Sequence, residues 1–477
     1  MYIRSKYLLF ICLFALVSFA SKAEIKLPSF FSDGMVLQQE MDVPVWGTAK
    51  SGSKITISTS WDNNKKIVET DSKGNWKVYV KTPSAGGPYS ISLSEDNGGP
   101  VVVEDVLIGE VWLCSGQSNM EMPMKGYKNQ PVDNSNMDIL KSKNNNIRLF
   151  TVKRNSSIDT KSDVKGEWDM ATPASVKEFS ALGYYYGKLL NEVLDVPVGL
   201  ICSSWGGSWI ESWMDKEMLV KFSDVKLPKD DSDIKEKNRT PTTLYNAMIA
   251  PLVGYGMRGV IWYQGESNYD KHESYLELFK TMVSEWRSRW GQGEFPFYYC
   301  QIAPYDYALV TKEGDDVVNS AYLREAQMKA EFEIPNSGMA VLMDAGSEKC
   351  IHPSQKNVAA ERLAFQALGK TYGIEGITAD SPVFKDMTIE GDTIVLSFDR
   401  ADMWISSQND NFTNFVVAGD DRQFHKAEAW ISRSKVYVKS EFVKNPVALR
   451  YAFTNYAHGD LFGTSGLPVS SFRTDNW

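Results

Sequence analysis

Short runs in which apolar and polar residues alternate fill the chain from residue 24 to about residue 105. The runs at 43–47, 54–58, 76–80 and 89–93 are rich in Val, Ile, Tyr or Trp, and turn-forming residues separate them. Alternation with a period of two is typical of strands that bury one face. This region is therefore predicted to be an all-β module of the sandwich type.

From about residue 106 to residue 375, near-continuous apolar runs alternate with amphipathic segments. Such runs are typical of parallel strands that helices cover on both faces. The helical period is clearest at 275–290 and 179–193. We predict a three-layer α/β domain with a parallel sheet, whose site lies at the carboxyl ends of the strands. The predicted strands are 111–114, 147–152, 198–203, 259–263, 297–302 and 339–343.

The strand pattern returns in the last part of the chain, 376–477, with runs at 393–398, 427–431, 435–438 and 447–453. The pattern leaves open whether the two β-rich ends form one sandwich or two modules. A polar stretch at 224–243, poor in apolar residues, is predicted to be a mobile surface loop.

The first 23 residues resemble a secretory signal. Arg4 and Lys6 precede a short apolar run at 7–19, and Ser21 and Ala23 supply the small residues of a cleavage site. We therefore expect an exported protein, either periplasmic or secreted. The apolar run is too short for a transmembrane helix, and no later stretch is long and apolar enough to span a bilayer.

The 477-residue chain is 23% charged and 43% hydrophobic, a balance that excludes a disordered protein. Its formal charge is −9, and removal of 1–23 takes away three cations, giving 48 − 60 = −12. A surface this acidic disfavours nucleic acid and membrane partners. There is no metal-binding motif and no nucleotide-binding loop, so no cofactor is expected. The four cysteines after residue 23 show no zinc-like spacing and are expected to be mainly buried thiols.

Four segments that follow predicted strands could carry chemistry. Ser118 lies in a tight turn after the strand at 111–114, although it lacks the GxSxG pattern. Gly206 and Gly207 follow the strand at 198–203, where exposed backbone N–H groups could form an oxyanion hole. Each segment taken alone could also be an ordinary turn.

The third and fourth segments supply the remaining polar groups. Gln264 and Glu266 follow the strand at 259–263, and Ser267 there is a second candidate nucleophile on spacing alone. His352 is the one histidine between a middle-domain strand and a helix, and Pro353 beside it suits a first helical turn. A neutral serine needs a base, which is usually histidine near neutral pH.

Residues 109–120 with GQSNM, 262–268 with WYQGESN, and Ile351-His352-Pro353 with Lys356 resemble the sialate O-acetylesterase family of carbohydrate esterases. That family belongs to the GDSL-like, or SGNH, hydrolases. The resemblance extends over nearly the whole chain after residue 23. It implies an SGNH-like esterase domain at 106–375, between the β-rich regions at 24–105 and 376–477.

The resemblance implies a metal-independent serine esterase that removes acetyl groups from sugar hydroxyls. Ser118 would be the nucleophile and His352 the base. The oxyanion would be held by the N–H of Ser118, a glycine N–H from Gly206-Gly207 (assigned to Gly207) and the Gln264 side chain. Trp209, Glu211 and Glu266 are the candidates for contact with the sugar, as are other aromatic residues near the motifs (Trp205, Trp213 and Tyr263).

The chain departs from the family pattern beside the base. SGNH enzymes usually carry an Asp three residues before the His, and many relatives carry one two before, but here these positions are Lys349 and Cys350. We favour a Ser-His dyad in which a backbone carbonyl orients His352, with Asp344 as a weaker candidate for the acid and Glu348 as another. The same machinery could instead act on acetylated xylan or pectin, and a non-catalytic glycan-binding protein is the alternative of a different class.

Overall fold

The computed structural model describes residues 25–477 except 63, 97–98, 315, 402–403 and 408–411. The predicted signal at 1–23 lies outside the described residues. The N-terminal module is all β, as its alternating runs predicted, and its strands pair antiparallel apart from β1, which runs parallel to β7 (Val101–Gly116). Its strands are β1 (Val36–Gln38), β2 (Asp42–Thr48), β3 (Lys54–Thr59), β4 (Lys65–Glu69), β5 (Asn75–Lys81) and β6 (Gly86–Glu95).

Strand β7 joins this module to the centre of the molecule. It pairs with β1 and β6 in its first part and becomes the middle strand of the central sheet in its second part. The expected boundary at residue 105 therefore lies inside one continuous strand rather than in a linker. Because one strand serves both sheets, it fixes the module firmly to the central domain.

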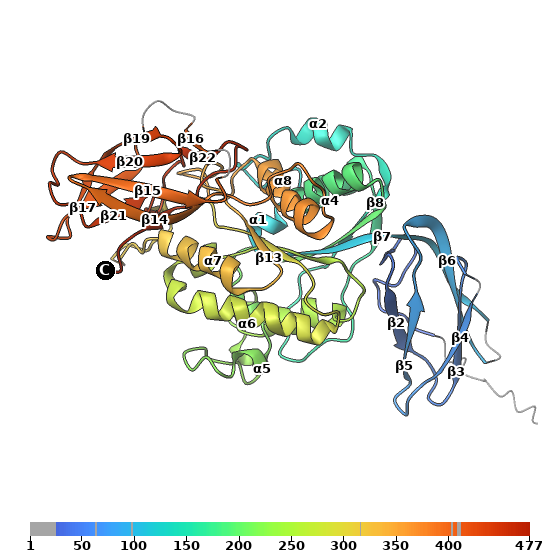
Figure 1. Cartoon of the computed structure of the whole chain (residues 1–477). Helices are drawn as coiled ribbons and strands as arrows, with labels where there is room; N and C mark the ends of the chain where they lie inside the picture. The colour runs from blue at the N-terminus through green and yellow to red at the C-terminus, as the bar shows by residue number, and fades with distance from the viewer. Residues whose placement is uncertain (1–24, 63, 97–98, 315, 402–403, 408–411) are drawn as a thin grey trace, which may run out of the picture.

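The central sheet has the order β13-β12-β11-β7-β10-β8-β9, and its strands are parallel except for β9. Two layers of helices cover it: α4 and α8 lie on one face, and α6 and α7 lie on the other (Figure 1). The three-layer α/β prediction is confirmed. The strands are β8 (Asn144–Thr151), β9 (Trp168–Ala171), β10 (Val198–Ser204), β11 (Gly259–Tyr263), β12 (Phe297–Cys300) and β13 (Ser337–Ala340).

The α-helices are mostly short, and the two longest occupy the segments with the clearest helical period. They are α1 (Ser118–Glu121), α2 (Ser135–Leu140), α3 (Pro173–Glu178), α4 (Ala181–Leu194), α5 (Lys216–Leu219), α6 (His272–Trp290), α7 (Ala321–Glu333) and α8 (Lys356–Gln366). None of the helices in the described part of the chain is long and apolar enough to cross a membrane.

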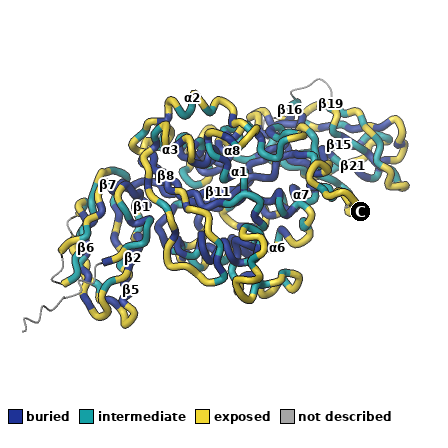
Figure 2. Tube along the Cα trace, turned by 180° about the vertical axis from the view of Figure 1, so that it is seen from behind, coloured by how far each residue is buried: buried dark blue, intermediate teal, exposed yellow. Residues whose placement is uncertain are grey.

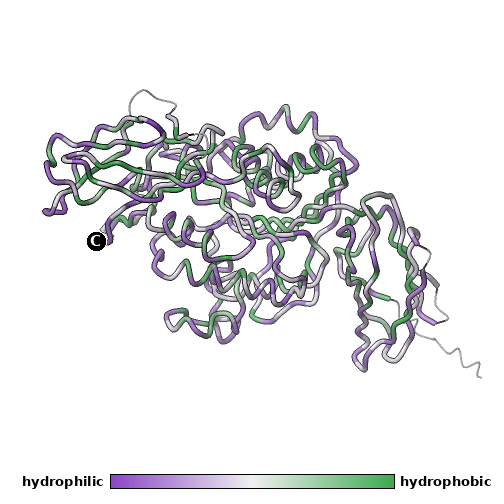
Figure 3. The backbone as a smooth tube through the Cα atoms, in the orientation of Figure 1, coloured by the Kyte–Doolittle hydropathy of each residue, from purple (hydrophilic) through white to green (hydrophobic). Residues whose placement is uncertain are grey.

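Both faces of the central sheet are apolar, which explains the continuous runs in the sequence. Along β7, Trp112 and Cys114 belong to the core under α4 and α8, whereas Val111 and Leu113 belong to the core on the opposite face. The sheet is buried along its length (Figure 2), and hydrophobic residues concentrate in its central strands (Figure 3). Parallel strands covered on both faces require this pattern.

The C-terminal region forms a separate β module. The N-terminal and C-terminal modules lie at opposite ends of the central domain in both views (Figures 1 and 2), so they are two modules rather than one sandwich. The buried Arg324 on α7 ties the C-terminal module to the core by donating to Thr454 O and Ser471 Oγ. Its strands are β14 (Val383–Glu390), β15 (Thr393–Asp399), β16 (Ile405–Ser407), β17 (Phe415–Ala418), β18 (Phe424–Lys426), β19 (Glu428–Ser432), β20 (Lys435–Lys439), β21 (Ala448–Tyr451), β22 (Leu461–Gly463) and β23 (Phe472–Arg473).

Candidate active site

Ser118 stands at the carboxyl end of β7, on the sharp turn that begins α1. The turn needs glycine at position 116, where φ is +134° and a Cβ atom would lie 2.1 Å from Tyr263 O. The Gln117 N–H donates to that same carbonyl at 2.9 Å, which fixes the turn against β11. Ser118 itself is half-buried and lines a cleft of about 790 Å³.

His352 faces Ser118 across this cleft. Its Nε2 lies 2.7 Å from Ser118 Oγ, and its Nδ1 lies 2.6 Å from Gln130 Oε1. Because the amide oxygen of Gln130 can only accept a hydrogen bond, Nδ1 carries the proton and donates it. Nε2 therefore directs its lone pair at the serine hydroxyl. The arrangement is that of a serine hydroxyl beside a neutral imidazole base.

Gln130 therefore occupies the position in which a catalytic triad holds a carboxylate. It lies in the loop between α1 and α2, far from His352 in the sequence, and no motif marks it. The edge of the Tyr127 ring packs against the imidazole, with the ring centroids 5.3 Å apart. Sequence reasoning missed both residues, because neither follows a predicted strand.

The environment of His352 favours the neutral imidazole. Burial, with a smaller contribution from the nearby Lys356 ammonium, lowers its pKa to about 4. No carboxylate forms a hydrogen bond with the ring in the described part of the chain. A positive charge on His352 is thus disfavoured before a substrate arrives.

Asp344 and Glu348 do not reach His352. Arg362, on α8, donates two hydrogen bonds of 2.7 Å to Asp344, which hold this carboxylate against that helix. Glu348 is exposed and has no hydrogen bond to the imidazole among the described residues. The geometry agrees with a dyad, but the side-chain amide of Gln130, rather than the expected backbone carbonyl, orients the base. Both acidic candidates lie outside the site.

Two backbone N–H groups remain available beside Ser118. The N–H of Ser118, at the first position of α1, and the N–H of Gly207 have no hydrogen-bond partner within the described ranges. A Cβ atom on Gly206 would lie 3.2 Å from Ser118 Cβ, so this turn packs directly on the serine. The Gly206 N–H donates instead to Glu121 Oε2 at 2.7 Å, which leaves Gly207 as the glycine donor.

The polar insertion at 224–243 contributes to this turn. Asn238 Nδ2 donates to Gly206 O at 2.7 Å, and Arg239 Nε donates to Gly207 O at 3.1 Å. These contacts orient the Gly206-Gly207 peptides, so the end of the insertion belongs to the site rather than to a detached surface loop. The polar composition of residues 224–243 gave no indication of this role.

Gln264 does not face the cleft. It is fully buried, and its amide group donates to Ser208 O at 3.1 Å and to Asn268 Oδ1 at 2.7 Å. Both of its N–H groups are therefore used inside the protein, and the expected oxyanion contact is not formed. Glu211 is also buried, where it accepts from Asn268 Nδ2 at 3.0 Å rather than lining the cleft.

Of the other expected contact residues, Trp209 and Glu266 line the cleft. Trp209 borders it, but Lys271 Nζ lies over one face of the indole at 3.5 Å from the centroid. Trp205, Trp213 and Tyr263 are not among its lining residues, and the last two are fully buried. Ser267 is present in the lining, yet its hydroxyl forms no hydrogen bond with a histidine among the described residues. Only Ser118 combines exposure to the cleft with an adjacent base.

A buried polar cluster supports the nucleophile and the base together. Asn119 donates to Glu266 at 2.5 Å and to Ile351 O at 3.1 Å, and it accepts from Lys356 Nζ at 2.5 Å. Burial raises the pKa of Glu266 and lowers that of Lys356 to about 8. Asn119, the residue after Ser118, is thus hydrogen-bonded to Ile351, the residue before His352.

The described residues contain no cluster of three or more His, Cys, Asp or Glu side chains able to hold a metal ion. Cys114, Cys202 and Cys300 are buried as free thiols, as their apolar runs predicted. Cys350 is half-buried, and its Sγ donates to His352 O at 3.2 Å, which stabilises the loop that carries the base.

Comparison with known proteins adds independent evidence. Residues 108–364 match the family model described as carbohydrate esterase, sialic acid-specific acetylesterase. A sialate O-acetylesterase from Mus musculus is 26% identical, over 93% of this chain and 92% of its own. One from Homo sapiens is 28% identical, over 90% and 88%. The crystal structure of XAC1771, a carbohydrate acetylesterase from Xanthomonas citri, is 36% identical with a TM-score of 0.86, and the match covers 95% of this chain and 100% of the other.

Proposed function

This chain belongs to the carbohydrate esterase family of sialic acid-specific acetylesterases, and we propose that it hydrolyses acetyl esters on sugar hydroxyls with Ser118 as the nucleophile. The observation that carries the assignment of residues is the 2.7 Å contact between Ser118 Oγ and His352 Nε2 at the cleft. The family and the acetylesterase relatives support carbohydrate O-acetylesterase activity.

In the proposed reaction, Ser118 Oγ attacks the acetyl carbonyl while His352 Nε2 takes the hydroxyl proton. The N–H groups of Ser118 and Gly207 stabilise the oxyanion of the tetrahedral intermediate. His352 then returns the proton to the departing sugar oxygen, which leaves an acetyl group on Ser118. Water, activated by the same histidine, releases acetate. General base catalysis contributes roughly 10²–10⁴-fold, and each oxyanion donor about 10²–10³-fold.

We propose an O-acetylated sialic acid as the preferred substrate, on the strength of the cleft's cations and the curated relatives. Arg239 lines the cleft and packs near Trp209, with its guanidinium carbon 5.6 Å from the indole centroid. Arg154 also lines it but is bound by both oxygens of Glu121. Arg239 has one contact with a carboxylate, from Nη1 to Glu236 Oε2 at 3.3 Å, and is the better placed of the two for a substrate carboxylate. Lys125 and Arg258 pair with Glu178 and Glu110 instead.

The test is acetate release from a panel of O-acetylated sialic acid, acetylated xylan and acetylated pectin. We expect the highest kcat/KM on the sialic acid. Replacement of Arg239 by Gln should raise KM more for this substrate than for neutral xylan, because only the acidic sugar presents a carboxylate. The lost contact with Gly207 O should lower kcat on both substrates alike. A higher kcat/KM on xylan or pectin would reassign the substrate, and no release from any of the three would refute the activity.

Replacement of Gln130 by Ala should lower kcat about 10–100-fold. The variant loses the acceptor that fixes the tautomer and orientation of His352, but no buried charge is removed, so the loss should stay below the ~10⁴-fold seen when the Asp of a triad is replaced. Steady-state acetate release measures the effect. Asp344→Asn and Glu348→Gln are the matched controls, each expected to change kcat by less than about tenfold. A larger loss in either control than in the Gln130 variant would reinstate an acidic third member.

The pH profile of kcat/KM should rise with an apparent pKa of about 4 and remain high above it. His352 must be neutral to accept the serine proton, and burial lowers its pKa to about 4. Activity is therefore lost only as the pH falls through that value and the ring becomes protonated. Replacing Lys356 by Met should move this limb to higher pH, because the ammonium that disfavours the imidazolium is gone. If kcat/KM of the unmodified protein already fell as the pH dropped through about 6.5, the buried environment proposed for His352 would be contradicted.

We also propose that residues 1–23 direct export, as their charged start, apolar run and small-residue end indicate. The substrate would then be a glycan outside the cytoplasm.

A further inference from the structure

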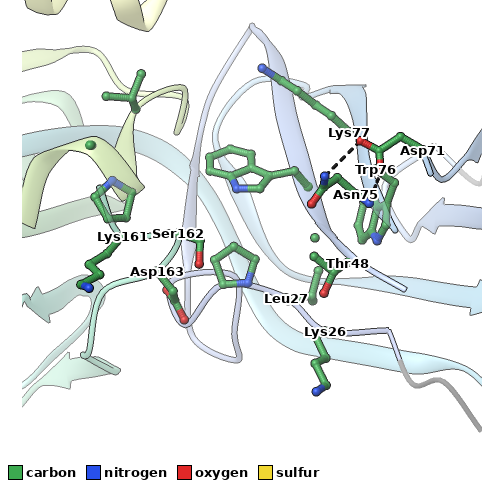
Figure 4. Close-up of a pocket in the computed structure, with 16 residues that line it drawn as sticks. Lys26, Leu27, Thr48, Asp71, Asn75, Trp76, Lys77, Lys161, Ser162 and Asp163 are labelled. Atoms are coloured by element: carbon green, nitrogen blue, oxygen red, sulfur yellow. Dashed lines mark hydrogen bonds between the residues drawn. The ribbon is translucent and has the colours of Figure 1, made fainter. Parts of the chain in front are cut away.

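A second cleft lies where the N-terminal β module meets the central domain (Figure 4). Strands β2 and β5 and residues 26–28 form one wall, and residues 161–163 and 250–253 form the other. It shares no lining residue with the cleft at Ser118. Its volume of about 750 Å³ falls within the usual range of small-molecule sites.

The cleft offers an aromatic surface. Trp46 is only half-buried, and edge contacts with Phe30 and Phe31, at centroid distances of 5.5 and 4.7 Å, hold its ring in place. Trp76 also lines the cleft, and its buried Nε1 has no hydrogen-bond partner among the described residues. A fixed, partly exposed indole presents the flat apolar area on which a sugar ring can stack.

Small polar groups surround this surface. Thr48, Asn75 and Ser162 are exposed at the cleft, and the two hydroxyls form no hydrogen bond in the described part of the chain. Asn75 uses its amide nitrogen on Asp71, at 3.0 Å, and keeps its oxygen free. Uncharged donors and acceptors around an aromatic ring match the hydroxyl groups of a carbohydrate.

The three lysines of the cleft form no ion pair among the described residues, whereas its two aspartates accept hydrogen bonds from backbone N–H groups. Lys26, Lys77 and Lys161 stand on different sides of the cleft, at its rim (Figure 4). Lys77 Nζ lies 5.3 Å from the centroid of the Tyr79 ring. Asp71 accepts from the N–H groups of residues 73 and 75, each at 2.8 Å, and Asp163 accepts from the N–H groups of residues 29 and 164. Three lysines against two aspartates leave the cleft with an excess of positive charge, on a chain whose formal charge is −9, and this favours anions locally.

We propose that this junction cleft is a second carbohydrate-binding site and that its ligand is an acidic glycan whose carboxylate groups meet the three lysines. The indole of Trp46 stacks on a ring, and the hydroxyl groups nearby bind the sugar hydroxyls. The site acts by holding the glycan chain to the protein and takes no part in ester hydrolysis. It is therefore independent of the chemistry proposed for Ser118.

The test uses the full chain with Ser118→Ala, so that no probe is consumed. Titration calorimetry with sialyllactose and with a galacturonic acid trimer, against lactose as the neutral probe, measures binding. We expect Lys26→Gln/Lys77→Gln/Lys161→Gln to weaken binding of the galacturonic acid trimer about tenfold, the sum of three exposed ion pairs. Binding of sialyllactose, which carries one carboxylate, should weaken about two- to threefold. The same three-charge change at Lys426, Lys435 and Lys444, exposed on the C-terminal module, is the matched control and should leave binding unchanged.

Two further measurements separate this site from the cleft at Ser118. Trp46→Ala should weaken the binding of the acidic probes and Trp46→Phe should largely restore it, with circular dichroism confirming the fold of each variant. With Ser118 present, hydrolysis of p-nitrophenyl acetate should be the same in all lysine variants. The proposal fails if the parent binds neither acidic probe, if lactose binds as tightly as sialyllactose, or if the two lysine triples bind the acidic probes equally.

Discussion

Replacement of Ser118 by Ala should lower kcat for acetate release by roughly 10⁴–10⁶-fold, because the covalent route through the serine is lost. The remaining activity would come from the N–H groups of Ser118 and Gly207 and from substrate binding. The fold should persist, since Ser118 is half-buried and its hydroxyl forms a hydrogen bond only with His352 among the described residues. The measurement is acetate release with the thermal unfolding curve of the same sample.

Ser267→Ala is the matched control for this prediction. Ser267 lines the same cleft, so the two substitutions remove the same group from the same surroundings. We expect Ser267→Ala to change kcat by less than about tenfold, because no base adjoins its hydroxyl. If the losses were reversed, Ser267 would be the nucleophile and the pairing of Ser118 with His352 would be structural.

Replacement of His352 by Ala should lower kcat about as far as loss of the serine does. The imidazole serves twice, as base for the attack and as acid for the departing sugar oxygen, and no other base contacts Ser118 in the described structure. The double variant with Ser118→Ala should be no slower than either single variant, because the two residues act as a unit. Multiplicative losses would mean that the two side chains act separately.

The parts of the site that follow strands were predictable from the sequence. Apolar runs marked the strands, and the carboxyl ends of parallel strands meet at one edge of a sheet, so Ser118 and Gly207 could be placed together. His352 followed from the scarcity of histidines in the middle domain. Local patterns and the topology of the fold identified these candidates, whereas their roles as nucleophile, oxyanion donor and base came from the resemblance to the carbohydrate esterase family.

The partner of the base was not predictable in the same way. Gln130 lies in an irregular loop 222 residues from His352, and an uncharged amide carries no signature of catalysis. Asp344 looked better because it follows the strand predicted at 339–343, but β13 ends at Ala340 and Arg362 on α8 binds the carboxylate. Gln264 was misjudged for a related reason: its position after a strand was visible, whereas the direction of its side chain depends on packing against Asn268 and Tyr275.

The arrangement of the two β modules could not be predicted from the alternation of apolar and polar residues. The period of two identified strands in both β-rich ends, but pairing partners depend on contacts between distant segments. The path of β7 shows that the N-terminal module is continuous with the central sheet. This module lies at the end of the central domain opposite the C-terminal module (Figure 1).

The most direct test of the central claim is detection of the acetyl-enzyme. Protein mixed with an O-acetylated sialic acid, quenched in acid within the first turnovers and digested, is analysed by mass spectrometry. The account predicts one acetyl group on the peptide that contains Ser118, and none on that peptide in the Ser118→Ala variant. An acetyl group on Ser267, or steady acetate release with no acetylated serine at any quench time, would contradict it.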